Sequence, residues 1–170
     1  EATTGRSIDR LGDLLDALYQ RHADFHDLGC RLSDHGLSYC FSTDGTEADA
    51  ERCFDELRRT KDEACPVSPE DADRMGGVLM REFARWDSER GWTKQLHLGA
   101  RRNNNRRLFQ AVGPDIGCDS IGDWPQTDRL CQFLDDLDQR RHLPKIIVYN
   151  LNPADNYAVA TALGNFQDGS

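Results

Sequence analysis

The sequence predicts an α/β fold in which short parallel strands are joined by helices. Three observations support this class. Segments with helical apolar spacing alternate along the chain with short strand-like runs. The run 145–150 is continuous and rich in β-branched residues, which is typical of a strand covered on both faces. No stretch rich in Ser, Gly or Pro divides the 170 residues, so we expect a single segment without an internal domain boundary.

Five helical patterns follow one another, each with a recognisable start or end. Ser7 is placed to cap the first helix, Thr46 begins the second, and Ser68 caps the third with Pro69 in its first turn. Glycine or proline then marks where several of these patterns stop. The predicted helices are 8–25, the segment that begins at Thr46, 69–90, 127–142, and the segment from Asn152 to about residue 163.

Three strands are predicted, at 28–34, 92–98 and 145–150, and the helices between them imply right-handed parallel crossovers. No long periodic pattern covers 99–124, although 106–112 is compatible with a turn or two of helix. Three strands cannot close a barrel, which needs eight strands and about 250 residues. We therefore expect either the middle of a larger (β/α)8 barrel or a small open sheet. In both, polar residues near the strand ends, Asp34, His97 and Asn150, meet at the carboxyl edge, where such sheets bind ligands.

The composition limits the classes of partner. Apolar residues make up 38% and charged residues 30% of the chain, and 30 acidic against 21 basic residues give a net charge of −9. This charge disfavours binding to nucleic acid or to anionic membrane surfaces. The six cysteines are widely scattered, which favours buried thiols in a reducing compartment, and the first residues lack the pattern of a secretory signal. We expect a cytoplasmic protein that binds a small molecule.

The strongest signal of a binding site lies in residues 94–105. Strand alternation places His97 on one face with Thr93 and Gln95. The other face carries Lys94, Leu96 and Leu98. Gly99 permits a sharp exit, after which Arg101 or Arg102 can present a planar cation to a carboxylate and three asparagines offer donors and acceptors. Such a loop suits a small, polyhydroxylated anion. The alternative is a surface strand followed by a solvated polar loop.

Several motifs, in their order and spacing, resemble the glucuronate (uronate) isomerase family. The most specific are His-x-Gly-Ala-x-Arg-Asn-Asn-Asn from His97 and Asp-Ser-Ile-Gly-Asp from Asp119. The resemblance runs from about residue 29 to residue 169 and is sparse between 39 and 87. The segments that carry it are 33–36, 95–100, 102–105, 113–115, 119–123, 151–153 and 164–167.

The resemblance implies a part of a TIM-type barrel of the metal-dependent hydrolase (amidohydrolase-like) kind. It also implies aldose–ketose isomerisation in uronate catabolism: D-glucuronate to D-fructuronate, and D-galacturonate to D-tagaturonate. Carried over residue by residue, the catalytic positions are Asp34, His97 and Arg102, and the substrate-binding positions are Arg102, His35 and Asn103. Arg102 would hold the substrate carboxylate or an adjacent oxygen, His97 would stand beside the reacting carbons or a metal, and Asp34 would bind hydroxyls or transfer a proton.

Two motifs of the family are missing here, its His-x-His pair and its Asp-x-Arg. Both are associated with a divalent, zinc-like metal, so the resemblance implies that the metal ligands lie mostly outside this chain, and no metal ligand is assigned within it. Residues 1–170 would then be the central portion of the barrel, incomplete for catalysis alone. Whether the parent protein forms a homo-oligomer is left open.

Simpler roles exist for several of these residues. Asp34 can be a turn or capping carboxylate, His97 a core histidine, His35 a partner of its own loop, and the asparagines can shape the loop without contacting substrate. Two other functions also remain open. One is metal-assisted hydrolysis by an amidohydrolase-type barrel, and the other is a non-catalytic domain that binds sugar acids.

Overall fold

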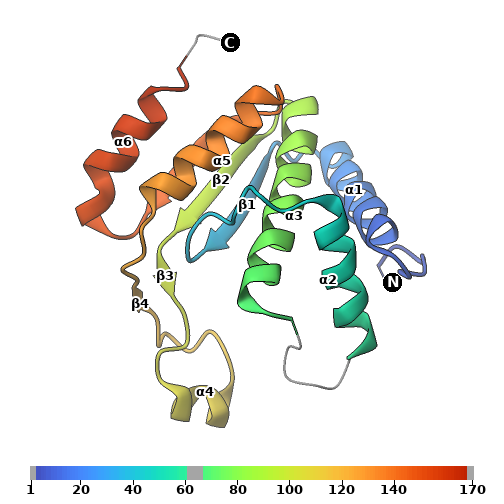
Figure 1. Cartoon of the computed structure of the whole chain (residues 1–170), viewed down its shortest axis with the longest axis horizontal. Helices are drawn as coiled ribbons and strands as arrows, with labels where there is room; N and C mark the ends of the chain where they lie inside the picture. The colour runs from blue at the N-terminus through green and yellow to red at the C-terminus, as the bar shows by residue number, and fades with distance from the viewer. Residues whose placement is uncertain (1–2, 61–66, 168–170) are drawn as a thin grey trace.

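The computed structural model describes residues 3–60 and 67–167 and contains a parallel three-stranded sheet with helices around it (Figure 1). The sheet order is β1, β2, β5, so each strand lies beside the next main strand in sequence. The order of main elements, helix, strand, two helices, strand, helix, strand, helix, is the predicted one. The strands are β1 (Leu32–Leu37), β2 (Thr93–Leu98) and β5 (Lys145–Asn150), and the main helices are α1 (Leu11–Asp27), α2 (Glu47–Arg59), α3 (Pro69–Glu89), α5 (Thr127–Gln139) and α6 (Asn156–Gly164).

The first strand differs from the prediction. It begins at Leu32 and continues through Gly36 to Leu37, whereas 28–34 was expected. Gly36 does not end the strand because it pairs with His97 in the parallel register, and Leu37 pairs with Leu98. The glycine therefore has ordinary strand partners, and Asp34 lies in the middle of β1.

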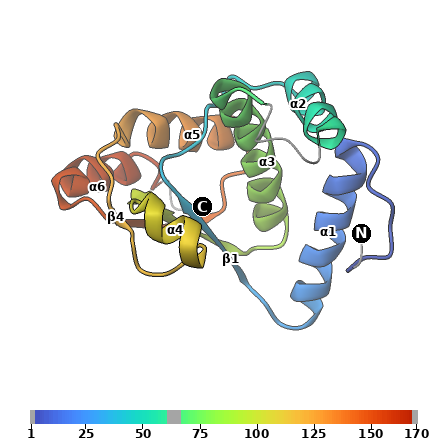
Figure 2. The same ribbon diagram turned by 90° about the horizontal axis from the view of Figure 1, so that it is seen from below.

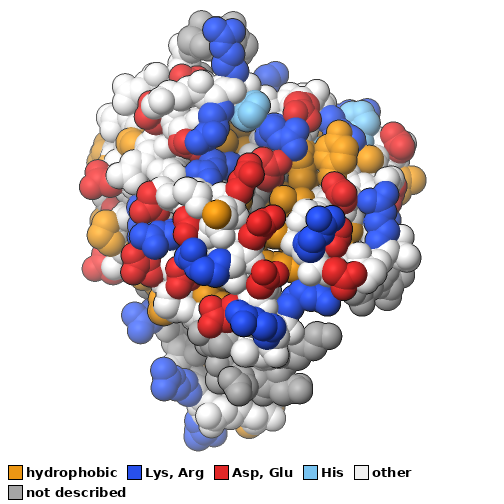
Figure 3. Space-filling model, turned by 45° about the vertical axis from the view of Figure 1, so that its right-hand side comes forward, with side chains coloured by type: hydrophobic (Ala, Val, Ile, Leu, Met, Phe, Trp, Pro, Cys, Tyr) orange, Lys and Arg blue, Asp and Glu red, His pale blue; other side chains and the backbone are white. Residues whose placement is uncertain are grey.

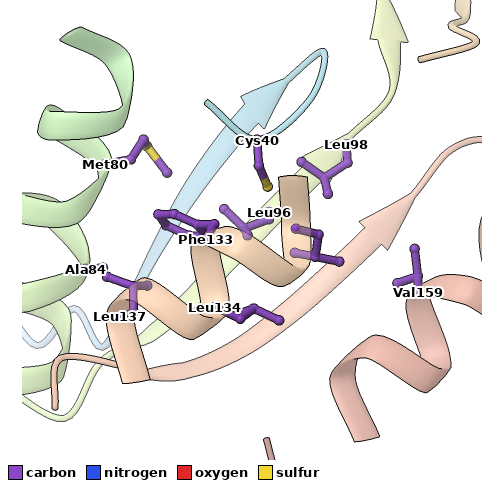
Figure 4. Packing of buried hydrophobic residues seen from close by; sticks show 10 residues of the cluster. Cys40, Met80, Ala84, Leu96, Leu98, Phe133, Leu134, Leu137 and Val159 are labelled. Carbon is purple, nitrogen blue, oxygen red and sulfur yellow. The ribbon is translucent and has the colours of Figure 1, made fainter. Parts of the chain in front are cut away.

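One face of the sheet holds the main core. Side chains of β2 alternate strictly, and Lys94, Leu96 and Leu98 are fully buried against the helices. Figure 4 shows the two leucines beside α5, whose apolar stripe is the predicted one. The α5 residues in this cluster are Leu130, Phe133, Leu134 and Leu137, joined by Met80 and Ala84 of α3 and Val159 of α6.

Within the part of the chain that the structure describes, the opposite face of the sheet is open. In β5, Lys145, Ile147 and Tyr149 are exposed and alternate with half-buried residues, so the expectation that both faces of this strand are covered is wrong for the described part of this chain. The continuous apolar run of β5 misled the prediction, because Ile147 belongs to the open face. Seen from below, α6, α5, α3, α2 and α1 follow one another in an arc (Figure 2).

The helix starts follow capping chemistry. Thr46 caps α2 through a reciprocal pair of bonds with Asp49, and the Ser68 hydroxyl accepts the backbone N–H of Asp71 at the start of α3. The predicted start of α1 at residue 8 is wrong. Its cap is Arg10, whose backbone N–H is accepted by the Asp13 carboxylate, and the helix begins at Leu11.

The segment before α2 packs very closely on α3. A Cβ added at Gly77 would lie 1.8 Å from the backbone oxygen of Ser42, and one at Gly76 would lie 2.7 Å from the ring of Phe41. Only glycine permits this approach, so the position of the chain that leaves β1 depends on these two residues of α3.

Beyond the carboxyl ends of the strands, the chain forms a small antiparallel pair that the sequence did not indicate. Strand β3 (Ala100–Arg101) pairs with β4 (Ser120–Ile121), and the short helix α4 (Arg106–Val112) lies between them in sequence, at the position expected for a turn or two of helix. In Figure 1 the arrowheads of β1 and β2 point toward this region. The last helix is preceded by a 3-10 turn, Pro153–Asp155, capped by Asn152.

Charges of both signs are interspersed on the face shown in Figure 3, with hydrophobic side chains between them. In the part of the chain that the structure describes, no helix combines the length and apolar character needed to cross a bilayer. Cys40 and Cys53 are buried as expected, whereas Cys30 is exposed, and Cys65 lies outside the described residues.

Candidate functional site

A cavity of about 740 Å³ lies at the carboxyl edge of the sheet. Its lining comes from the middle and end of β1, from the end of β2, from the β3–β4 pair and the residues beside it, and from Leu151 after β5. Three predicted catalytic residues, Asp34, His97 and Arg102, all line it. The parallel strand order therefore brings together side chains that are distant in sequence, at the edge where such sheets bind ligands.

Asp34 and His97 form a direct pair. The His97 Nδ1 and Asp34 Oδ1 atoms are 2.7 Å apart, and both side chains are about half exposed on the open face of the sheet. When the imidazole is neutral with its proton on Nδ1, this contact makes Nε2 the nitrogen with a free lone pair. Within the described residues, neither His97 Nε2 nor Asp34 Oδ2 makes a hydrogen bond, so both atoms are available to a ligand.

Tyr149 completes this arrangement and was not predicted. It is the register partner of His97, and the two rings stack with centroids 4.3 Å apart and planes 6° apart. The Gln95 amide donates to the Tyr149 hydroxyl at 3.2 Å. Period-two alternation in β5 could have placed Tyr149 on the face of His97, but the run was interpreted as covered on both sides.

Arg102 extends from the β3 segment and binds Asp119. Its NH1 group donates to Asp119 Oδ2 at 2.7 Å, and the other carboxylate oxygen accepts the backbone N–H of Asn103 at 2.9 Å. The backbone N–H of Asn103 and the guanidinium of Arg102 hold the pKa of Asp119 below its usual range. Asp119 lines the same cavity. It begins the Asp-Ser-Ile-Gly-Asp motif, but the sequence did not indicate a function for it.

The asparagines mainly shape the loop. Asn103 has a φ of +54° and is absent from the cavity lining. Asn104 donates to the backbone oxygen of Arg101 and to the Ser120 hydroxyl, both at 2.8 Å, and Asn105 caps α4. These contacts agree with the alternative that the asparagines shape the loop without contacting substrate. Arg101 does not line the cavity, and its Nε atom donates to Asn104.

His35 lies away from Asp34, on the helix-covered face of β1. Its Nε2 is 2.9 Å from Nζ of the buried Lys94, and its ring stacks on Phe83. Burial, followed by the charge of Lys94, lowers the pKa of His35 to about 4, so the ring is neutral and its Nε2 accepts a hydrogen bond from the ammonium. Because successive strand residues face opposite ways, the structure does not bring His35 to the cavity with its neighbour.

Lys94 is the centre of a buried polar cluster on that face. Its ammonium lies 2.8 Å from the carboxylate of the buried Asp87 and 3.3 Å from the Ser33 hydroxyl. Asp87 is also 3.0 Å from His22 of α1. These contacts satisfy the buried charges and join β1, β2, α1 and α3.

Asn150, the third polar residue expected at the strand ends, does not reach the cavity. Its amide donates to the Asn156 side chain at 3.0 Å, at the start of α6. It therefore organises the connection between β5 and α6.

The described residues do not form a metal site by themselves. No group of three or more histidine, cysteine, aspartate or glutamate side chains converges among residues 3–60 and 67–167. The Asp34–His97 pair offers at most two donor groups, fewer than the three protein ligands of a typical catalytic zinc site. The described residues alone therefore do not complete a metal centre.

The fold and the cavity define an α/β protein with a polar site at the carboxyl edge of a parallel sheet. The chain belongs to the glucuronate isomerase family, whose family model matches residues 1–170. The resemblance drawn from the motifs is thus confirmed.

Curated relatives and solved structures agree with this membership. The chain is 53% identical to a uronate isomerase of Opitutus terrae and 50% identical to one of Solibacter usitatus, over 96% and 95% of its own length. It is similar to the crystal structure of a uronate isomerase from Thermotoga maritima, with a TM-score of 0.83, 27% identity and 94% of this chain covered. A glucuronate isomerase structure from Caulobacter crescentus gives a TM-score of 0.77 at 28% identity over 91% of this chain. The chain spans only 31–34% of the length of these four proteins.

Proposed function

We propose that this chain contributes part of the active site of a hexuronate isomerase. The reaction would interconvert D-glucuronate with D-fructuronate, or D-galacturonate with D-tagaturonate. The observation that carries the proposal is the convergence of Asp34, His97 and Arg102 on one cavity. Family membership supports the same assignment, because the relatives are uronate isomerases.

These side chains suit the chemistry. In the open-chain sugar, isomerisation removes a proton from C2, passes through an enediolate and returns a proton to C1. His97, oriented by Asp34, can exchange a proton at Nε2, and the second oxygen of Asp34 can accept a hydrogen bond from a substrate hydroxyl. Arg102 can bind the substrate carboxylate with the N–H groups that Asp119 leaves free.

The open face of the sheet supports a larger barrel. The uncovered residues include Leu32, Ile147 and Tyr149, whose apolar surface natural proteins usually bury. Helices on one face and an apolar, ligand-bearing opposite face are what a segment of a TIM-type barrel presents. In this proposal residues 1–170 are the central portion of the barrel, and a divalent metal would take its ligands mainly from other parts of the longer protein.

The test uses the parent protein, meaning this chain with whatever sequence flanks it in its natural gene. Incubation with D-glucuronate should produce the ketose, which NMR detects. The product should have the same mass as the substrate. This chain alone should show no turnover. Products that have gained the elements of water would instead indicate a hydrolase, and binding without turnover by the parent protein would indicate a non-catalytic domain.

Substitution of Arg102 by Met tests the carboxylate site. Loss of the guanidinium should lower kcat/KM by about ten- to a hundredfold, because a hydrogen bond between charged groups contributes about 1.5–3 kcal/mol. The matched control is Arg101→Met, which removes the neighbouring cation outside the cavity and should change kcat/KM by less than about threefold. Equal effects of the two changes would exclude Arg102 from substrate binding.

A further inference from the structure

We propose that Asp119 is a positioning residue that fixes the guanidinium of Arg102 over the cavity. This inference rests on the proposed function, because it needs Arg102 to bind substrate. Its basis is a carboxylate whose two oxygens bind two consecutive residues, the side chain of Arg102 and the backbone N–H of Asn103.

The need for positioning follows from the exposure of Arg102. Its side chain is 57% exposed, and a long exposed arginine loses much of its rotamer freedom when it is ordered. If the ordering occurred only on binding, substrate affinity would be reduced by that cost. The contact of 2.7 Å with Asp119 orders NH1 before substrate arrives.

Asp119 is itself held in place. The antiparallel pairing of Arg101 with Ser120 sets the two segments side by side. Asn104 adds two bonds across the same gap, from its backbone N–H to the Cys118 oxygen and from its side-chain amide to the Ser120 hydroxyl, both at 2.8 Å. The residues before and after Asp119 are therefore both bonded to the segment that carries Arg102, which fixes the backbone at position 119.

The contact also sets the direction of the guanidinium. A Cβ added at Gly36 would lie 3.5 Å from NH2 of Arg102, so this end of the group lies over β1, where Asp34 lines the same cavity. With NH1 committed to Asp119, the remaining N–H groups are left for a ligand.

The charge of Asp119 distinguishes positioning from simple electrostatics. A carboxylate near an anionic substrate weakens binding by repulsion, so removal of its charge alone would lower KM. A positioning role predicts the opposite outcome, since a misplaced guanidinium loses its geometry toward substrate. The sign of the change in kcat/KM therefore separates the two roles.

The experiment compares variants of the parent protein with D-glucuronate as substrate. Asp119→Asn should lower kcat/KM about tenfold, and Asp119→Glu, which keeps the charge but moves the carboxylate by one methylene, should also lower it. Asp115→Asn is the matched control, because Asp115 is exposed, lies in the same loop and has a φ of +61° that asparagine tolerates. It should leave kcat/KM unchanged.

A double-mutant cycle completes the test. If Asp119 acts through Arg102, Asp119→Asn should have no further effect once Arg102 is replaced by Met. An independent, additive loss, or an unchanged or increased kcat/KM in both Asp119 variants, would overturn the positioning role. If Arg102→Met itself leaves turnover unchanged, the proposed function of Arg102 fails. If Arg102→Met is impaired and the Asp119 variants are not, only the role of Asp119 fails.

Discussion

At the scale of single residues, Tyr149 sets the plane of the His97 ring while Asp34 fixes its Nδ1 atom. Together these contacts determine where Nε2 points. A ring held by one hydrogen bond can still rotate about that bond, so the stacking contact is what restricts the remaining freedom.

Replacement of Tyr149 by Leu should therefore lower kcat of the parent protein about three- to tenfold, the equivalent of an aromatic stacking contact of about 0.5–1.5 kcal/mol. Tyr149→Phe keeps the stacking and loses only the bond from Gln95, so its kcat should stay near that of the unchanged protein. Steady-state kinetics with D-glucuronate measure both variants. An equal loss in the two variants would assign the effect to the hydroxyl instead of the ring.

His35 makes stability depend on pH. Its pKa is about 4 in the folded chain and 6.5 when unfolded, so the unfolded state binds more protons between these values. The contribution to stability is complete above pH 6.5 and is lost as the pH falls toward 4, with a total of about 3 kcal/mol. His35→Gln retains an acceptor for Lys94 but does not titrate. Urea unfolding of the chain at pH 4 and pH 7 should show a smaller loss of stability in the variant, whereas parallel losses would contradict this origin.

Strand patterns indicated Asp34 and His97, and the family resemblance selected Arg102 over Arg101, but neither indicated a role for Asp119 or Tyr149. The first set lies on or just after strands, where alternation and the parallel order determine position. Asp119 lies 17 residues from Arg102, across a segment without periodicity, and only the β3–β4 pair brings them together. The opposite error affected His35. Because it follows Asp34 in sequence, it was expected in the same site, but strand alternation places the two side chains on opposite faces of the sheet.

At the scale of elements, the contact between α3 and the segment before α2 depends on Gly77. Gly77→Ala should destabilise the chain by about 1–3 kcal/mol or more, because its Cβ would collide with the backbone oxygen of Ser42. Gly12→Ala in α1 is the matched control. A Cβ there meets nothing within 4 Å, so alanine should stabilise the helix by about 0.5–1 kcal/mol. Thermal unfolding of both variants, followed by circular dichroism, should show midpoints that move in opposite directions.

The main helices and strands were predicted as to type, whereas the start of α1, both ends of β1, the β3–β4 pair and the open face of β5 were not. The second and third helix starts were found because Thr46 and Ser68 carry capping chemistry. The end of β1 was missed because Gly36 resembles a terminator, and its pairing with His97 depends on a strand far away in sequence. Tertiary pairing thus overrode a local signal.

At the scale of the whole molecule, the uncovered sheet face is the feature that the chain's own sequence could not resolve. The alternatives of an open sheet and part of a barrel contain the same three parallel strands. They differ in what covers Leu32, Ile147 and Tyr149, and in the proposed barrel that depends on residues outside these 170. The core under the helices is determined locally, by the leucines of β2 and the stripe of α5.

The antiparallel pairing that joins residues 100–101 to 120–121 has an evolutionary consequence. It closes the base of an excursion whose tip, the helix α4, lies away from the sheet (Figure 1). Because the entropy of closing such an excursion rises only slowly with its length, insertions and deletions at the tip should be tolerated. Natural variants can therefore diverge there in length and composition while the ligand-facing geometry is inherited unchanged.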